Sequence, residues 1–228
     1  MFDKHIAIFV PGRLYRNNRY CFAFLKILKE KLLAENIKPV FFASLSEECD
    51  VQSITEEFCN LFDIVREEQL NIESVYIPSD IYNFPKRPEA NYENTFRMFY
   101  HNYKCFQMIK QYTEKHKITF DYVIKWRTDI GIYNGFNELL HSIVSLVKND
   151  DAKNENAVYV PAQDMWAGIS DQLGLGNYNI MNTYCQCISN IHIMCHSGVI
   201  YHPETLLYNH CKLNNLDVKN FDAFYHVL

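Results

Sequence analysis

Short apolar runs alternate with longer amphipathic stretches in the first part of the chain. Residues 5–10 (HIAIFV) form an apolar run that ends at Pro11 and Gly12, which predicts a buried strand followed by a tight turn. Residues 20–35 carry apolar side chains at helical spacing, and residues 40–43 (VFFA) predict a second strand. A strand–helix–strand unit of this kind favours parallel pairing with a right-handed crossover.

The same alternation continues along the rest of the chain. Three prolines interrupt residues 76–91, so this stretch predicts a long loop, whereas residues 94–116 have the apolar stripe of a long helix. Residues 120–126 (FDYVIKW) and 157–160 (AVYV) predict two later strands. The pattern further predicts helices at 51–61, 137–147, 171–188 and 204–214, a short strand at 63–65 and a polar loop at 149–156.

Length and composition narrow the class of protein. The chain has 228 residues, of which 48% are hydrophobic, so one domain can bury a full core without disulfides. Because strands and helices alternate, we expect a single α/β domain, 1–228, built on a mostly parallel sheet flanked by helices. The net charge of −5 gives no basic footprint for nucleic acid, and we expect no nucleic-acid partner.

The distribution of apolar residues gives no sign of a membrane span or a signal peptide. No stretch has the roughly 18 consecutive apolar residues of a membrane span, and no apolar signal-peptide region follows the first residues. The eight cysteines are irregularly spaced, which favours free thiols over a disulfide framework. These features predict a cytoplasmic protein without a membrane span.

The segment Arg127-Thr128-Asp129 is the first candidate site. It follows the predicted strand 120–126, and open α/β sheets bind ligands beyond the carboxyl ends of their strands. Side chains two residues apart share a face while the chain stays extended. Asp129 offers oxygens to Mg²⁺ or Mn²⁺, and Arg127 offers a phosphate clamp. The alternative is a structural ion pair at the end of the strand.

The turn after the first strand is a second candidate. Pro11, Gly12 and Arg13 stand where nucleotides meet sheets of this kind. A single glycine makes neither a dinucleotide fingerprint nor a Walker-type loop, so the turn predicts only a diphosphate contact through Arg13 and backbone N–H groups. The alternative is a surface turn with solvated arginines.

Two later segments carry further candidates. Asp171, beside Ser170 in a glycine-rich stretch, can serve as a general base or bind sugar hydroxyls, or either side chain can cap a helix. His202 and His210 can bind a metal or a diphosphate, or they are ordinary core or surface residues. Glu204 falls in the first turn of a predicted helix, where the macrodipole stabilises a carboxylate in any case.

A zinc site is a further possibility that the spacing disfavours. Two histidines and three cysteines crowd into twelve positions, but tetrahedral sites usually bring two Cys-x-x-Cys-like pairs with a longer insert. Isoleucines and a methionine lie between them, as in a buried segment, so we expect no structural zinc there. The residues are Cys185, Cys187, His192, Cys195 and His196.

Together these segments resemble the cytoplasmic, sugar-nucleotide-dependent glycosyltransferases of the GT-A type. Among them they are most similar to the polysaccharide-building enzymes of bacterial capsule and lipopolysaccharide-core loci and their relatives in large DNA viruses. The resemblance covers most of the chain, and its order is more specific than any one piece. It rests on residues 125–130 (KWRTDI), 158–161 (VYVP), 170–176 (SDQLGLG) and 202–207 (HPETLL), with the Gly12-Arg13 turn upstream.

The resemblance implies an enzyme that transfers a hexose or pentose from a nucleotide-diphosphate sugar, with a UDP-sugar favoured, to a glycan acceptor. It also implies Mn²⁺ or Mg²⁺ as the cofactor. Residues 1–130 would form the donor nucleotide-binding half and residues 131–228 the acceptor-side half. Asp129 matches the last carboxylate of the family's Asp-x-Asp metal motif, whereas Arg127 replaces the first one. This departure puts the metal requirement in question, because the arginine can itself neutralise part of the negative charge of the donor's diphosphate.

Such a transfer passes through an oxocarbenium-like state while negative charge grows on the leaving diphosphate, and cations there stabilise it. Asp171 is the expected base for the acceptor hydroxyl, with Glu204 second. The expected metal ligands are Asp129 and His210. The expected donor site comprises Pro11, Gly12, Arg13, Arg127 and Asp129.

Two other functions fit a sheet of this kind. A non-catalytic sugar-nucleotide or glycan-binding module would bind the donor without turnover. A nucleotidyltransferase would carry a glycine-rich, lysine-containing phosphate loop near the N-terminus, and the sequence has none.

Overall fold

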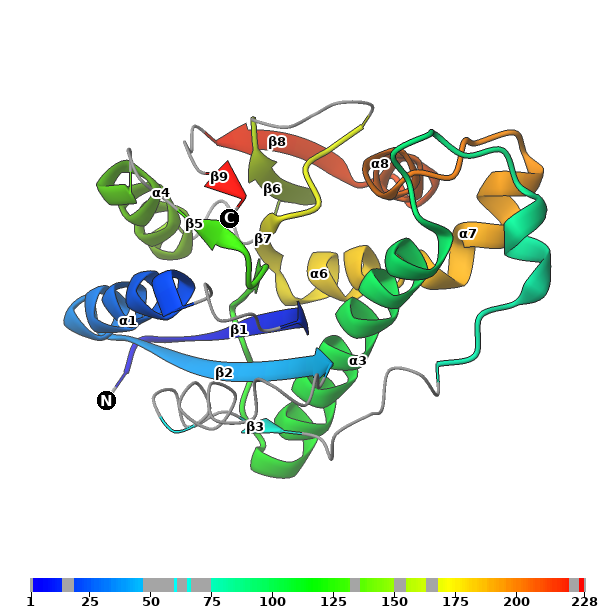
Figure 1. Ribbon diagram of the computed structural model, residues 1–228. Helices are drawn as coiled ribbons and strands as arrows, with labels where there is room; N and C mark the ends of the chain where they lie inside the picture. Colours follow the sequence, from blue (N-terminus) through cyan, green and yellow to red (C-terminus); the bar gives the residue numbers. More distant parts are fainter. Residues whose placement is uncertain are drawn as a thin grey trace.

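The computed structural model describes residues 2–13, 19–46, 60, 65–66, 75–131, 136–149, 155–162, 168–221 and 226–227. Strands and helices alternate along these residues (Figure 1). The first elements are β1 (Lys4–Arg13), α1 (Arg19–Ala34), β2 (Ile37–Ser46), β3 (Val65–Arg66), the 3₁₀ helix η4 (Ser79–Asn83), α3 (Tyr92–His116), β4 (Tyr122–Trp126) and β5 (Ile130–Gly131). The later ones are α4 (Phe136–Lys148), β6 (Ala157–Pro161), β7 (Leu173–Asn177), α6 (Tyr178–Cys185), α7 (Cys187–His196), α8 (Pro203–Leu213), β8 (Asp217–Phe221) and β9 (His226–Val227).

One sheet joins strands from both ends of the chain, in the order β3-β2-β1-β4-β7-β6-β8. β1 is parallel to β2 and β4, and β2 is parallel to β3. β7 is antiparallel to both of its neighbours, β4 and β6, while β8 is parallel to β6. Every strand of this sheet except β7 therefore points the same way, and the predicted mostly parallel α/β class is confirmed. The short strands β5 and β9 form a separate antiparallel pair.

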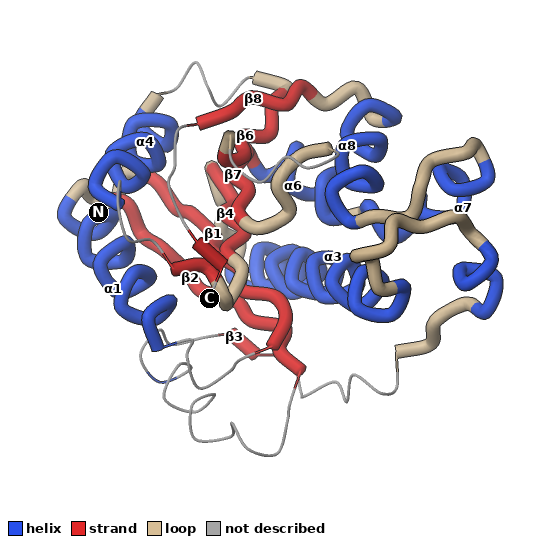
Figure 2. The backbone as a smooth tube through the Cα atoms, turned by 45° about the horizontal axis from the view of Figure 1, so that its top comes forward, coloured by secondary structure: helices blue, strands red, loops and turns tan. Residues whose placement is uncertain are grey.

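Helices cover both faces of the sheet (Figure 2). The alternation of side chains along β1 sorts the core into two layers. Ile6, Ile8 and Val10 pack with α1 and α4, whereas Ala7 and Phe9 pack with α3 and α6. Burial on both faces explains why the sequence of β1 is a continuous apolar run.

The predicted helix at 94–116 begins two residues earlier than its apolar stripe. Asn91 caps it, because its side-chain oxygen accepts a hydrogen bond from the backbone N–H of Asn94 at 2.9 Å. Lys117 ends the helix in the left-handed region, with φ of 54°. The helices predicted at 20–35, 137–147 and 204–214 and the strands predicted at 5–10, 40–43, 120–126 and 157–160 are likewise confirmed within a few residues.

The helix predicted from Asp171 toward Ile188 is wrong in its first part. Residues 173–177 form β7, and a helix begins only after Asn177, whose side chain caps α6 by accepting from the N–H of Ile180 at 3.0 Å. The strand alternates leucine and glycine, and the glycines leave room for α6. A Cβ at Gly176 would lie 3.1 Å from Ile180. The glycines hid this strand, because they lack the side chains that reveal a period of two.

Three predictions fall largely beyond the described residues. Of the helix predicted at 51–61 only residue 60 is described, and of the strand predicted at 63–65 only Val65, which begins β3. Most of the loop predicted at 149–156 also lies outside. Across the part of the chain that the structure describes, no helix combines the length and the apolar character needed to cross a bilayer.

Candidate functional site

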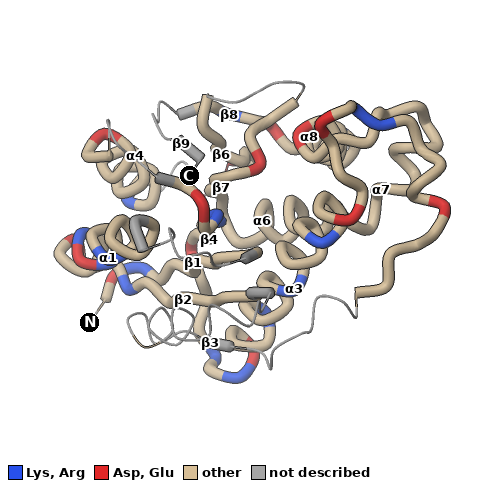
Figure 3. Tube along the Cα trace, in the orientation of Figure 1, with Lys and Arg blue, Asp and Glu red and all other residues tan. Residues whose placement is uncertain are grey.

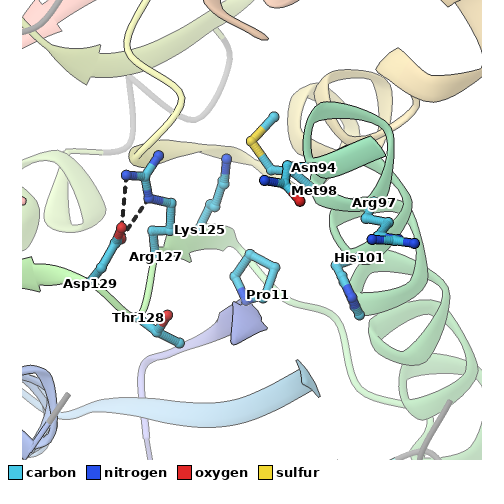
Figure 4. A pocket seen from close by; sticks show the side chains of 10 residues that line it. Pro11, Asn94, Arg97, Met98, His101, Lys125, Arg127, Thr128 and Asp129 are labelled. Atoms are coloured by element: carbon cyan, nitrogen blue, oxygen red, sulfur yellow. Dashed lines mark hydrogen bonds and ion pairs between the residues drawn. The ribbon is translucent and has the colours of Figure 1, made fainter. Parts of the chain in front are cut away.

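A pocket of about 350 Å³ opens at the carboxyl ends of β1 and β4 (Figure 4). The end of β1 forms one side of it. The end of β4, with the residues that follow, forms the second side, and the N-terminal half of α3 forms the third. The lining residues are Pro11, Gly12, Asn94, Arg97, Met98, His101, Lys125, Arg127, Thr128 and Asp129.

The topology of the sheet explains why the pocket lies there. From β1 the chain passes through α1 to β2 on one side, and β4 joins the other side of β1 after α3. α1 and α3 cover opposite faces, so the connections diverge and leave a crevice beyond β1 and β4. Ligands of open α/β sheets bind at such switch points.

Arg127 links two carboxylates from distant parts of the chain. Its Nε donates to Oδ1 of Asp129 at 2.6 Å, and an Nη donates to Oδ2 at 2.9 Å, which makes the pair bidentate. Its other Nη donates to both carboxylate oxygens of Asp171 at 3.2 Å. The backbone helps to fix the group, because the N–H of Arg127 donates to the carbonyl of Gln172 at 3.0 Å. Figure 3 shows basic and acidic positions side by side near the end of β4.

The exposure of these groups differs in a way that matters for their roles. The side chains of Arg127 and Asp129 are 23% and 24% exposed, so both reach the pocket. The side chain of Asp171 is only 6% exposed and lies behind Arg127. Asp171 therefore holds the guanidinium from the buried side, while Asp129 holds it at the pocket surface.

Lys125 is a buried cation beside Arg127. It comes from the face of β4 that packs with α3, has no exposed surface, and donates to the backbone carbonyl of Asp171. Its side chain and that of Arg127 project from β4 to the same side of the pocket (Figure 4). Burial lowers the pKa of Lys125, and the nearby Asp171 opposes that shift.

The wall opposite β4 is a face of α3. Asn94, Arg97, Met98 and His101 recur on it at helical spacing. Arg97 pairs with Glu93 at 3.3 Å, and Nδ1 of His101 lies 2.8 Å from the hydroxyl of Ser44 on β2. The lining as a whole carries the cations Arg97, Lys125 and Arg127 and the carboxylate of Asp129. An anion with an apolar or aromatic portion suits this combination.

The end of β1 contributes backbone to the pocket, because the strand continues through the turn predicted at Pro11 and Gly12 as far as Arg13. Pro11 and Gly12 line it, and Gly12 has φ of 115°, a conformation that favours glycine. Among the described residues, apart from its chain neighbours, no atom lies within 4 Å of the place that a Cβ on Gly12 would take. The side chain of Arg13 lies outside the described residues, and its predicted contact with a diphosphate stays a prediction.

The predicted Mn²⁺ or Mg²⁺ does not fit Asp129 in its present arrangement. Both carboxylate oxygens accept hydrogen bonds from Arg127, and Lys125 adds a second cationic side chain close by. A divalent ion at Asp129 would have to displace the guanidinium and would face its repulsion.

The remaining predicted residues lie away from the pocket surface. Both ring nitrogens of His210 are hydrogen-bonded, to the carbonyl of Thr183 at 2.7 Å and to the amide of Asn190 at 3.0 Å, and burial lowers its pKa. The structure thus does not bring His210 together with Asp129. Glu204 is 7% exposed in the first turn of α8 and does not line the pocket.

Several residues that line the pocket were not predicted to belong to a site. Lys125 had a signal, because a lysine inside the apolar run FDYVIKW breaks the pattern of a buried strand. No such signal in the sequence marks Arg97, Met98 and His101. They belong to the amphipathic pattern of a helix, and only its packing beside β1 and β4 makes them part of a site.

Comparison with known proteins gives matches by structure alone. No family model matches the chain, and no curated protein does. The similar solved structures include a glycosyltransferase involved in glycosylation of the major capsid of PBCV-1, with 8% identity and a TM-score of 0.45 over 95% of this chain and 81% of that one. The glycosyltransferase GlyE of Streptococcus pneumoniae matches with 12% identity and a TM-score of 0.44 over 96% of this chain, which spans 45% of GlyE.

A third similar structure is the galactosyltransferase LgtC in complex with donor and acceptor sugar analogs. It has 12% identity and a TM-score of 0.44, over 94% of this chain and 72% of LgtC. These three solved structures are glycosyltransferases.

Proposed function

We propose that this chain is a glycosyltransferase that moves a hexose or pentose from a nucleotide-diphosphate sugar to a glycan acceptor, with a UDP-sugar as the favoured donor. The observation that carries the proposal is the pocket at the switch point of the sheet, which Lys125 and Arg127 line together with the end of β1. A diphosphate is the part of the donor that cations and backbone N–H groups bind best.

The charges that form in the transition state indicate which residues take part in the reaction. Bond cleavage at the anomeric carbon leaves an oxocarbenium-like sugar and increases the negative charge on the leaving diphosphate. Lys125 and Arg127 stabilise that charge without reorganising, because their positions are already fixed by hydrogen bonds to the 171–172 segment. The wall of α3 supplies Met98 and His101 for the apolar and polar parts of the nucleoside.

Asp171 then has a different role from the one its sequence context predicted. A base for the acceptor hydroxyl needs to reach the substrate, but Asp171, unlike Lys125, does not line the pocket and contacts Arg127 from behind. We propose that it positions Arg127 and that Asp129 is the carboxylate that touches substrate. The assignment of residues 131–228 to the acceptor, and of Glu204 as a second base, remains open to test.

The first test is nucleotide binding by calorimetry with a panel of UDP-, GDP-, CMP- and dTDP-sugars, each with and without Mn²⁺. Hydrogen bonds to charged groups contribute about 1.5–3 kcal/mol each, so Arg127→Ala should weaken donor binding roughly tenfold to hundredfold. Arg127→Lys keeps the charge but loses the bidentate geometry, so it should fold and bind with intermediate affinity. Arg87→Ala is the control, because Arg87 is a partly exposed arginine that does not line the pocket.

Measurement of turnover distinguishes a glycosyltransferase from a non-catalytic binding module. Asp129→Ala should abolish sugar transfer and donor hydrolysis while far-UV circular dichroism stays native. Binding without turnover under every metal condition would identify a non-catalytic binding module instead. Wild-type activity in the Asp129→Ala protein would remove this residue from the mechanism, and a strict need for Mn²⁺ would show that Arg127 moves aside for a metal.

A further inference from the structure

We propose that a second cluster, Asp80, His192 and His196, binds a zinc-like divalent transition-metal ion. One ligand atom from each of these side chains lies within 4.8 Å of the other two. Nδ1 of His192 is 3.1 Å from Oδ2 of Asp80, so two of the three groups are already in contact. None of the three lines the pocket described above, and the proposal does not depend on the proposed function.

The fold brings the three ligands together from two elements. His192 and His196 are four residues apart on α7 and therefore share one face of the helix. Asp80 lies in η4, which runs beside α7 on the side of the molecule away from α1 (Figure 1). The ring of Phe84 packs edge-on against both imidazoles, with centroid distances of 5.9 Å and 5.0 Å, and restricts their rotation.

The ligand set selects the kind of metal. Two imidazole nitrogens and one carboxylate oxygen suit Zn²⁺, whereas Mg²⁺ prefers oxygen ligands throughout. Bonds of about 2.0–2.1 Å place the ligand atoms of a tetrahedral zinc roughly 3.4 Å apart. The cluster therefore has to contract slightly. Asp80 and His196 are exposed and His192 is only half-buried, so their side chains can make that adjustment.

The cysteines of the same stretch do not belong to this site. Cys185 and Cys187 are fully buried in the core, and Cys195 is nearly so. Their side chains lie inside the core, whereas the cluster is at the surface, so they are not placed to share its ion. Of the Cys-His run, only His192 and His196 belong to the cluster, and their partner Asp80 lies over one hundred positions away in the sequence.

A metal at this position would tie η4 to α7. The chain after η4 is already fastened, because the carbonyl of Pro85 accepts from the N–H of Tyr201 at 2.8 Å and the hydroxyl of Tyr92 donates to the carbonyl of Phe84. η4 itself is joined to α7 through the Asp80–His192 pair. Because this segment leads into α3, whose next turns line the pocket, the ion would stabilise that wall.

The test uses the full chain after treatment with a chelator. Titration with ZnCl₂ in a calorimeter should give one equivalent of binding that Mg²⁺ does not reproduce. Zinc should also raise the midpoint of thermal unfolding, since a ligand of the native state stabilises it by mass action. Asp80→Asn, which keeps the size and removes the charge, should weaken this binding at least tenfold.

Matched histidine variants decide whether this cluster is the site. The double variant His192→Ala/His196→Ala should lose one equivalent of zinc and its thermal shift, while His141→Ala, which removes an exposed histidine from α4, should keep both. Unchanged zinc stoichiometry in the double variant would overturn the proposal, and so would a wild-type protein that binds no zinc at stoichiometric concentrations.

Discussion

At the scale of single residues, the pocket depends on cations held in place by hydrogen bonds to the chain. Arg127 is held by Asp129 and Asp171, and Lys125 by a backbone carbonyl. A buried lysine is costly, because its charged form loses hydration. Lys125 lies at the end of β4, next to the pocket. A diphosphate bound there would offset the loss of hydration.

Lys125 gives the site a predictable pH dependence. Its folded-state pKa is below the ordinary value of 10.5, so the unfolded chain binds more protons between the two values. The free energy of unfolding should therefore rise with pH across that window. Anion binding should change in the opposite direction, because deprotonation removes a cation from the pocket. Nucleotide affinity should thus fall as the pH approaches 10.5 from below.

Lys125→Met separates this residue from other groups that titrate in alkali. Methionine fills similar space without charge, so the variant should bind nucleotide weakly at every pH and should lose part of the alkaline slope in stability. Calorimetry over an alkaline pH series gives the pH profile of nucleotide affinity. Urea unfolding over the same series gives the pH profile of the free energy of unfolding. Identical pH profiles for the variant and the wild type would exclude Lys125 as their cause.

At the scale of elements, the segment before β7 positions the buried side of the site. The N–H of Ile169 donates to the carbonyl of Glu204 at 3.4 Å, and two residues further on Asp171 meets Arg127. Gly168 makes this possible, because a Cβ there would lie 2.0 Å from the Glu204 carbonyl oxygen. The first turn of α8 and the end of β4 are thus joined through this one segment.

Gly168→Ala should be strongly destabilising. The atoms that the new Cβ would meet belong to backbone, which cannot move aside cheaply, and overpacking of this kind costs about 1–3 kcal/mol or more. Gly174→Ala is the control, since the nearest atoms to its Cβ would belong to the side chain of Tyr184, with the hydroxyl at 3.3 Å, and not to backbone. Thermal unfolding should show a larger loss for Gly168→Ala. Equal losses would contradict the close approach of these two segments.

At the scale of the whole molecule, both proposed halves contribute to one sheet. β4 from residues 1–130 pairs with β7 from residues 131–228, and β5 pairs with β9 near the C-terminal end of the chain. Ile130, directly after Asp129, faces Val227 in that second pairing. We therefore expect residues 1–228 to unfold as a single cooperative unit.

Two matched variants test this cooperativity. Val123 in β4 and Val158 in β6 are both fully buried, and replacing either with alanine should lower the free energy of unfolding by about 1–3 kcal/mol. Urea unfolding followed by circular dichroism and by tryptophan fluorescence should give coincident curves for each variant. Separate transitions, with only one moved by each substitution, would show that the halves fold independently.

The sequence alone determined the features that depend on neighbours along the chain. The apolar run of β1, the stripe of α3 and the alternation of strands and helices are local patterns, and they predicted the parallel class. The placement of Gly12 and Asp129 at one sheet edge also followed, because parallel strands have their carboxyl ends together.

Tertiary structure decided everything that joins distant segments. The two carboxylates on Arg127, the wall of α3 and the insertion of β7 between β4 and β6 all depend on contacts across many residues. Glycines conceal β7, and no local period reveals that Asp80 meets two histidines of α7. Side-chain periodicity reports which face of an element is buried, and only the packing of the elements determines which side chains meet.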